Sequence, residues 1–200
     1  MWPMDSRSAY EARAAEYIDL LGSMEATAAA DREQIADWAA SVAGLVLDVG
    51  CGPGHWTDFL ERAGVAVLGL DPVEAFIQHA VQRFPQCRFA VARAQELPVA
   101  AGGVAGVLAW YSLIHTDPEH LDRALAEFAR VLRPGGGVLL GFFAGDRVEI
   151  FDHAVTPAWF WPPELLANRL EAAGFRVDDV VTRHSPGPRS HGAITARRIH

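Results

Sequence analysis

The chain has 200 residues, of which 50% are hydrophobic and 21% are charged, so we expect one folded domain with a sizeable core and exclude a disordered chain. Its net charge of −8 argues against nucleic acid as the main partner, because neutralising phosphates requires a basic face. The basic residues are all arginines, which excludes a lysine-based mechanism. Two cysteines, Cys51 and Cys87, are too few for a disulfide framework, and no signal peptide or membrane-spanning run is recognisable, so we expect a cytoplasmic protein without a membrane partner.

After two helical segments, strand and helix patterns alternate along the chain. In chain order we expect helices at 6–21 and 28–42, a strand at 45–49, a helix at 55–62, a strand at 65–70, a helix at 73–84, strands at 88–92 and 104–110, a helix at 118–132, a strand at 138–143, a helix at 163–173, and strands at 175–182 and 193–198. This alternation predicts an α/β fold, Rossmann-like and doubly wound, with a mostly parallel seven-stranded sheet and helices on both faces. We expect one domain, 1–200, with an N-terminal helical cap at 1–42, a core at 43–200 and a substrate-side loop at 144–162.

Three alternating glycines, Gly50, Gly52 and Gly54, directly follow the first predicted strand. Glycine lets the backbone approach a ligand closely and adopt dihedral angles that other residues avoid. A dinucleotide-binding turn would place the third glycine one residue later, and a phosphate-cradling loop would end in Gly-Lys-Ser/Thr. Asp48, at the end of the strand, favours a ligand with a positive charge and would repel phosphate. A purely structural turn is the alternative.

Asp71 and Pro72 end the second predicted strand, about twenty residues after the glycine loop. A carboxylate at this place can accept both ribose hydroxyls of a bound nucleoside. The alternative is that Asp71 caps the following helix. The pattern therefore predicts nucleoside binding without specifying which cofactor carries the nucleoside.

The fourth predicted strand ends in a polar segment that contains Tyr111, Ser112 and His115. A histidine has a pKa suited to a general base at neutral pH, so His115 is the candidate catalytic residue. The alternative is structural, with His115 orienting its loop through hydrogen bonds. Asp117 and Pro118 are typical of a helix start.

Two further segments, 91–98 and 130–137, complete a set of motifs with the glycine loop and the last predicted helix. This set, which spans roughly residues 43–182, resembles the class I S-adenosylmethionine (SAM)-dependent methyltransferases of the small-molecule type. The SAM contacts that the resemblance implies are Asp48, Gly50, Cys51, Gly52, Asp71, Pro72, Ala94, Gln95, Tyr111 and Ser112. Members of that family usually carry an acid at the position of Arg93, so here Ala94 and Gln95 are the expected adenine contacts.

The first predicted helix carries Tyr10 and Tyr17, which are seven residues apart and therefore share a face. In the family that the chain resembles, such a helix closes over SAM, which makes both tyrosines candidate substrate-binding residues. An ordinary amphipathic packing helix fits the same pattern.

The segment 151–161 is unusually rich in aromatic residues and contains His153 and Trp159. Such residues can form the wall of a pocket for a flat or apolar acceptor, so both are candidate substrate-binding residues. A homodimer contact or a satellite core are the alternatives. Arg183, Arg189 and His191 can hold an anionic group of an acceptor, or they are solvated.

The resemblance implies a methyltransferase that moves the SAM methyl group to a small-molecule acceptor by in-line displacement, with His115 as base and without a metal. A non-catalytic SAM-binding regulator retains the loop but lacks an acceptor pocket. A nicotinamide-dependent oxidoreductase shares the fold and Asp71, but the glycine spacing and Asp48 argue against it. A metal-dependent methyltransferase requires a carboxylate cluster that Asp117 alone does not provide.

Overall fold

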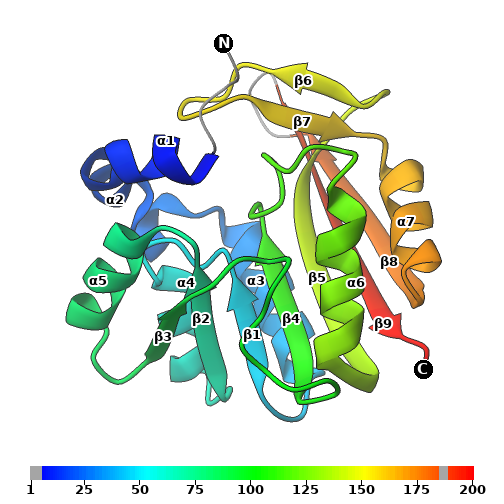
Figure 1. Cartoon of the computed structure of the whole chain (residues 1–200), viewed down its shortest axis with the longest axis horizontal. Coiled ribbons are helices and arrows are strands. Elements are labelled where there is room, and N and C mark those ends of the chain that lie inside the picture. Colours follow the sequence, from blue (N-terminus) through cyan, green and yellow to red (C-terminus); the bar gives the residue numbers. More distant parts are fainter. Residues whose placement is uncertain (1–5, 185–188) are drawn as a thin grey trace.

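The computed structural model describes residues 6–184 and 189–200, and its centre is a nine-stranded sheet (Figure 1). The strands are β1 (Val46–Val49), β2 (Val67–Asp71), β3 (Arg88–Val91), β4 (Val104–Trp110), β5 (Leu132–Ala144), β6 (Glu149–Phe151), β7 (Ala158–Trp161), β8 (Phe175–His184) and β9 (Ser190–Arg198). The helices are α1 (Ser6–Ala12), α2 (Ala14–Leu21), the 3₁₀ helix η1 (Met24–Ala26), α3 (Ala29–Ala40), α4 (His55–Arg62), α5 (Glu74–Arg83), α6 (Leu121–Val131) and α7 (Pro163–Ala172).

Seven of these strands form the predicted sheet, in the order β3-β2-β1-β4-β5-β9-β8. The pairs from β3 to β5 are parallel, whereas β9 runs antiparallel between β5 and β8. The mostly parallel α/β architecture is therefore confirmed. Because β1, β2 and β4 are parallel, their carboxyl ends lie at the same edge of the sheet.

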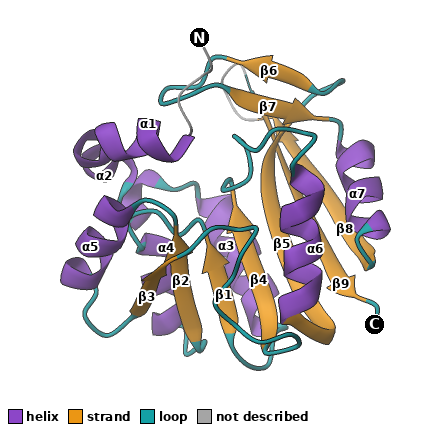
Figure 2. Cartoon of the chain, in the orientation of Figure 1, coloured by secondary structure: helices purple, strands orange, loops and turns teal. Residues whose placement is uncertain are grey.

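Helices cover both faces of the sheet (Figure 2). On one face, Val107 and Ala109 of β4 share a hydrophobic cluster with Phe128 of α6. On the other face, Leu108 packs in a cluster with Trp38 of α3. Side chains that alternate along a strand point to opposite faces, so a strand covered on both sides becomes a continuous apolar run. This is why the sequence of β4 shows no alternation of apolar and polar residues.

Two expectations about elements were wrong. The helix predicted over 6–21 is interrupted at Arg13, whose φ of −118° and ψ of 16° are not helical, and this residue separates α1 from α2. The region 144–162 is not a loop, because it contains β6 and β7, which pair with each other and extend the sheet from Phe143 and Ala144. β6 and β7 have only three and four residues and, unlike the equally short β1, are not followed by a glycine motif that marks them as strands.

Candidate functional site

A cavity of about 450 Å³ lies beyond the carboxyl ends of β1, β2 and β4. Helices α1 and α2 and the connection between β6 and β7 lie over this end of the sheet (Figure 1). This is the edge at which doubly wound sheets bind ligands. The predicted site residues that line the cavity are Tyr10, Tyr17, Gly50, Cys51, Gly52, Asp71, Pro72, Tyr111, Ser112, His115 and His153.

The glycine loop lines the cavity. Its backbone packs directly against the segment that follows β4. Gly50 has a φ of +76°, and a Cβ atom at this position would lie 2.1 Å from the Cβ atom of Ser112. The amides of Gly50 and Cys51 donate to the carbonyl oxygen of Leu70, at 2.7 and 3.0 Å. Only glycine meets both the conformational and the steric requirement at position 50.

Asp71 connects the ends of β1 and β2 through its carboxylate. Oδ1 accepts a hydrogen bond from the Val73 amide at 2.8 Å, and Oδ2 accepts one from the Gly52 amide at 2.9 Å. Burial raises the pKa of the carboxyl to about 6, and the two amide bonds act in the opposite direction. Val73, and not Asp71, is the N-cap residue of α5. Asp71 thus fixes the glycine loop and faces the cavity with a partly hydrogen-bonded carboxylate.

Asp48 lies behind the glycine loop and does not line the cavity. Its side chain is 2% exposed, and Oδ2 accepts a hydrogen bond from the Thr57 hydroxyl at 2.6 Å. Burial raises the pKa of this carboxyl to about 7, although the bond from Thr57 acts in the opposite direction. The expected direct contact with a positively charged ligand is therefore not what this geometry provides. Instead, Asp48 joins β1 to α4.

His115 is held by hydrogen bonds at both ring nitrogens. Nδ1 lies 2.8 Å from the carbonyl oxygen of Pro157, and Nε2 lies 2.8 Å from the Tyr10 hydroxyl. Because a carbonyl oxygen can only accept, Nδ1 carries the proton, and Nε2 accepts the proton of Tyr10. Burial lowers the pKa of His115, and the bond to Pro157 acts in the opposite direction. These hydrogen bonds agree with the structural interpretation, and the role of His115 as a base stays a prediction.

The two tyrosines of the N-terminal helices point into the same cavity. The ring centroids of Tyr10 and Tyr17 are 5.4 Å apart, and they lie 6.0 and 5.3 Å from the ring of Phe76. The two tyrosines lie on different helices, α1 and α2, so they do not share the face of one helix as predicted, but their rings still contact each other. Arg13 also donates a hydrogen bond to the carbonyl oxygen of Ala154, which joins the N-terminal helices to the connection between β6 and β7.

Aromatic rings and imidazoles form the wall opposite the glycine loop. The Phe143 ring lies 5.1 Å from that of Tyr111, 5.6 Å from His191 and 6.0 Å from His153. The Tyr111 hydroxyl and His191 Nδ1 are 2.6 Å apart. Tyr111 itself has a φ of 55°, which is uncommon for a residue other than glycine and occurs most often at functional sites.

Three further lining residues, His55, Trp110 and Phe143, were not predicted as site residues from the sequence. Phe143 lies near the carboxyl end of β5, next to β4, and this position alone was a sufficient signal. Trp110 is the last residue of β4. His55 begins α4 immediately after the glycine loop, where a cofactor contact is expected for any polar side chain.

The two arginines considered as anion ligands are already engaged. Arg183 forms an ion pair with Asp31, and Arg189 lies over the Phe151 ring at 4.8 Å from its centroid. His191, in contrast, lines the cavity. The expectation of an anion-binding group at the C-terminal end is therefore not supported by the positions of Arg183 and Arg189.

Three expected contacts lie outside the cavity lining. Trp159 packs against the main hydrophobic core, and its amide donates to the Ile114 carbonyl oxygen at 2.9 Å. Ala94 is half-buried and Gln95 is exposed, and neither lines the cavity. Trp159 therefore supports the wall from behind, because its position on β7 directs it to the core side.

A second cleft of about 420 Å³ continues from the cavity toward β3. The two hollows share Arg7 and Pro72. The other residues that line this cleft are Val91, Ala92, Arg93, Glu96, Leu97 and Pro98. The structure thus provides an extended groove that passes from the 91–98 segment across Asp71 to the glycine loop.

Buried polar atoms without a partner mark where a ligand is expected. Among the described residues, these atoms are His55 Nδ1, Ser112 Oγ and His153 Nδ1, and all three residues line the cavity. Buried polar groups in native proteins are normally hydrogen-bonded, so each unpaired one requires an explanation. A polar ligand that lies along the cavity provides partners for all three. The described part of the chain contains no cluster of His, Cys, Asp and Glu that is suited to a metal ion.

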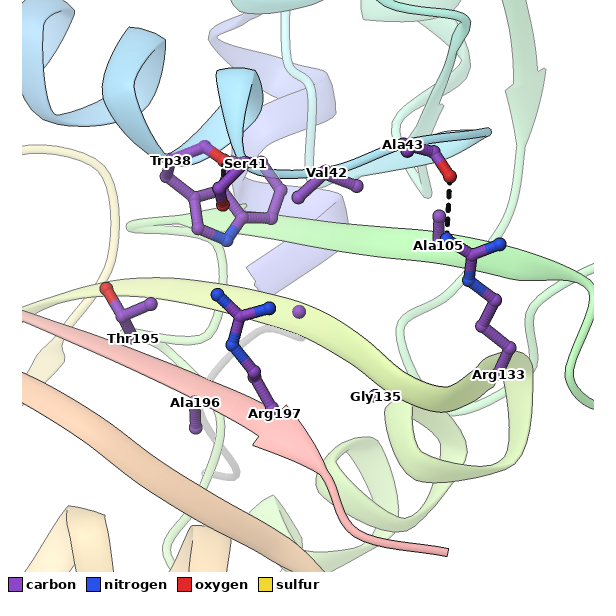
Figure 3. Close-up of a pocket in the computed structure, with 11 residues that line it drawn as sticks. Trp38, Ser41, Val42, Ala43, Ala105, Arg133, Gly135, Thr195, Ala196 and Arg197 are labelled. Carbon is purple, nitrogen blue, oxygen red and sulfur yellow. Dashed lines mark hydrogen bonds between the residues drawn. The ribbon is translucent and has the colours of Figure 1, made fainter.

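A smaller cavity of about 130 Å³ lies at the opposite end of the sheet, beside Trp38 (Figure 3). There, Arg133 donates to the carbonyl oxygen of Ala43 at 2.7 Å, and Arg197 donates to Asp178 at 2.8 Å. Both guanidinium groups already have partners, and ligands of such sheets bind at the carboxyl ends of the strands. We therefore assign the functional site to the larger cavity.

Comparison with known proteins identifies the family to which this site belongs. A family model described as a methyltransferase domain matches residues 46–136. A probable S-adenosylmethionine-dependent methyltransferase of Mycolicibacterium smegmatis is 34% identical over 144 residues, which cover 68% of this chain and 53% of that protein. The chain belongs to the class I SAM-dependent methyltransferases. A malonyl acyl-carrier protein O-methyltransferase of Pseudescherichia vulneris is also 34% identical, over 137 residues that cover 68% of this chain and 50% of that protein.

The chain spans about half the length of these curated relatives. Among solved structures, the 1,6-didemethyltoxoflavin-N1-methyltransferase of Burkholderia thailandensis, with bound 1,6-didemethyltoxoflavin and S-adenosylhomocysteine, has a TM-score of 0.80. It is 24% identical, and the match covers 97% of this chain and 87% of that one, which shows a shared methyltransferase fold. Within the described residues, no helix is long and apolar enough to cross a membrane.

Proposed function

We propose that this methyltransferase transfers the methyl group of SAM to a small-molecule acceptor. The observation that carries the proposal is the groove that joins the 91–98 cleft, Asp71 and the glycine loop to a separate wall of aromatic rings and imidazoles. A pocket that bound only the cofactor would not require the additional wall of aromatic rings and imidazoles. Among the relatives and solved structures, the names state malonyl acyl-carrier protein, 1,6-didemethyltoxoflavin and, for a protein of Galdieria sulphuraria, sarcosine and dimethylglycine as the compounds concerned.

The residues of the groove fit SAM in both charge and shape. Asp71 faces the cavity with lone pairs beyond its two amide bonds, and these can accept the ribose hydroxyls. The backbone of Gly50, Cys51 and Gly52 and the unpaired Ser112 hydroxyl would hold the methionine part. We place the adenine in the cleft that Ala92, Arg93 and Leu97 line. When bound, SAM supplies a sulfonium methyl group that a nucleophile can displace directly.

The chain's own contribution is to position the acceptor and to exclude water. The cavity is lined by Tyr10, Tyr17, Tyr111 and His153, whose side chains can position an acceptor. Holding two reactants in line for displacement can supply a large part of the rate acceleration. His115 is the candidate base, since burial lowers its pKa and it is therefore neutral at neutral pH. We expect neither a nucleic acid nor a membrane partner, and a homodimer would be detected by size-exclusion chromatography with light scattering.

The test is to incubate the protein with methyl-labelled SAM and a small-molecule extract, and to follow label into low-molecular-weight products. Label in a small molecule, lowered at least tenfold by H115Q and unchanged in H79Q, is the expected result. His79 is a matched control because it lies on α5 and does not line the cavity. Binding of S-adenosylhomocysteine without any transfer would instead indicate a non-catalytic regulator.

A further inference from the structure

The hydrogen bonds around His115 form a directed chain. His115 Nδ1 donates to Pro157, so Nε2 is the accepting nitrogen, and the Tyr10 hydroxyl must donate to it. Burial raises the pKa of Tyr10, so its hydroxyl keeps its proton at neutral pH. The Tyr10 oxygen still has lone pairs that can accept a proton from a ligand in the cavity. The accepting nitrogen of His115 is therefore occupied by the Tyr10 hydroxyl, through which a proton from a ligand in the cavity can reach it.

The wall next to this hydrogen-bond chain suits flat molecules. The rings of Tyr111, Phe143, His153 and His191 contact one another edge-on or at a tilt, and they present ring surfaces and polar edges. Burial lowers the pKa of His153 to about 4 and also lowers that of His191, so both imidazoles are neutral.

One charged side chain lies against this wall: the Arg189 guanidinium is 5.8 Å from the centroid of the Phe143 ring. The cavity has further charged side chains. Among the described lining residues they are Arg7, Asp31 and Asp71. Asp31 is neutralised by Arg183, Asp71 lies on the glycine-loop side, and Arg7 lies at the junction with the adenine cleft. The positive charge of Arg189 contributes, after burial, to the lowered pKa of His153, and the unpaired Nδ1 of His153 offers a hydrogen bond to an acceptor.

We propose that the acceptor is a flat ring compound with a weakly acidic proton on the atom that takes the methyl group, and that this proton reaches His115 through the Tyr10 hydroxyl. This inference rests on the proposed function. It adds the chemical class of the acceptor and assigns Tyr10 a direct part in the proton transfer.

The acceptor, Tyr10, His115 and SAM supply every bond that breaks and forms in the methyl and proton transfers. The acceptor's O–H or N–H bond breaks, and its proton forms a new bond to the Tyr10 oxygen, while the proton of Tyr10 moves to Nε2 of His115. The freed electron pair of the acceptor forms the bond to the methyl carbon, and the pair of the broken carbon–sulfur bond stays on sulfur. His115 becomes an imidazolium that donates to Pro157 and later releases one proton to solvent.

The test uses 4-nitrophenol, a flat ring compound whose ionised form is yellow and whose neutral form is not. The probe is added to protein saturated with S-adenosylhomocysteine, at a pH at which the free probe is mostly neutral. We expect a saturable yellow colour with the wild-type protein, and a colour at least tenfold weaker with Y10F and H115Q. The Y10F variant retains the ring that packs on Tyr17 and Phe76, so its affinity for S-adenosylhomocysteine should stay close to the wild-type value. The matched variant H79Q should develop the full colour.

Each result decides between explanations. Binding of the probe without colour, measured by nuclear magnetic resonance, would overturn the proton transfer, and failure to bind would overturn the ring class. Full colour in Y10F would overturn the role of Tyr10. A protein that does not bind S-adenosylhomocysteine at all would instead show that the proposed function is wrong, and the inference would fail with it.

Discussion

The contact between Gly50 and Ser112 allows one prediction to be worked out in detail. In G50A the new methyl group would lie 2.1 Å from the Ser112 Cβ atom, whereas two carbon atoms require about 3.5 Å. Overpacking of this kind costs about 1–3 kcal/mol. The φ of +76° costs an L-residue about 1–2 kcal/mol more. We therefore expect G50A to lower the free energy of unfolding by about 2–5 kcal/mol.

The two contributions can be separated by unfolding in urea. Gly64 has a φ of +83°, and a Cβ atom added there would meet nothing within 4 Å, so G64A should show only the conformational cost. The double variant G50A/S112G removes the clash and should regain about 1–3 kcal/mol relative to G50A. Two results would contradict this packing of the glycine loop. One is a free energy of unfolding for G50A that equals or exceeds that of G64A, and the other is a G50A/S112G variant that is no more stable than G50A.

Three other substitutions test the same region. D71N places an amide NH₂ group opposite one of the two donating backbone amides, so we expect the free energy of unfolding in urea to fall by about 1–3 kcal/mol. We also expect at least tenfold weaker binding of S-adenosylhomocysteine. Wild-type affinity would contradict the assignment of Asp71 to the ribose. The pKa of Asp48 is raised from 3.8 to about 7 on folding, so its contribution to stability is complete below pH 3.8 and is lost as the pH rises to about 7. The urea midpoint of D48N should therefore fall less across this range than that of the wild-type protein, and parallel curves would refute the assignment. E127A removes the carboxylate that accepts a hydrogen bond from the Leu97 amide at 2.7 Å and that pairs with Arg130. Hydrogen exchange at the Leu97 amide should therefore accelerate. Unchanged protection of this amide would show that Glu127 does not hold the 91–98 segment.

The sheet and the location of the site could be predicted because they depend on local patterns. Apolar runs mark the buried strands, and the glycines and Asp71 follow two of them at the carboxyl ends, where parallel strands place their ligand-binding residues. Eleven of the fifteen predicted site residues therefore line one cavity, namely all except Asp48, Ala94, Gln95 and Trp159.

The other features of the site and the fold depend on contacts between residues far apart in the sequence, which local sequence patterns do not indicate. Tyr10 and His115 are 105 residues apart, and only the packing of the N-terminal helices brings them together. Asp48 turns away from the cavity because Thr57, on the next helix, supplies a buried hydroxyl. The short strands of the β6–β7 hairpin form because β5 offers them a pairing edge, which cannot be seen in their own sequence.

The most direct test of the central claim is a calorimetric titration of the protein with S-adenosylhomocysteine, NAD and NADP, repeated with D71N. The account predicts saturable binding of S-adenosylhomocysteine alone, at least tenfold weaker in D71N because the variant loses the charge-assisted hydrogen bonds of the carboxylate. Binding of NAD or NADP without binding of S-adenosylhomocysteine would contradict the assignment of this cavity to SAM.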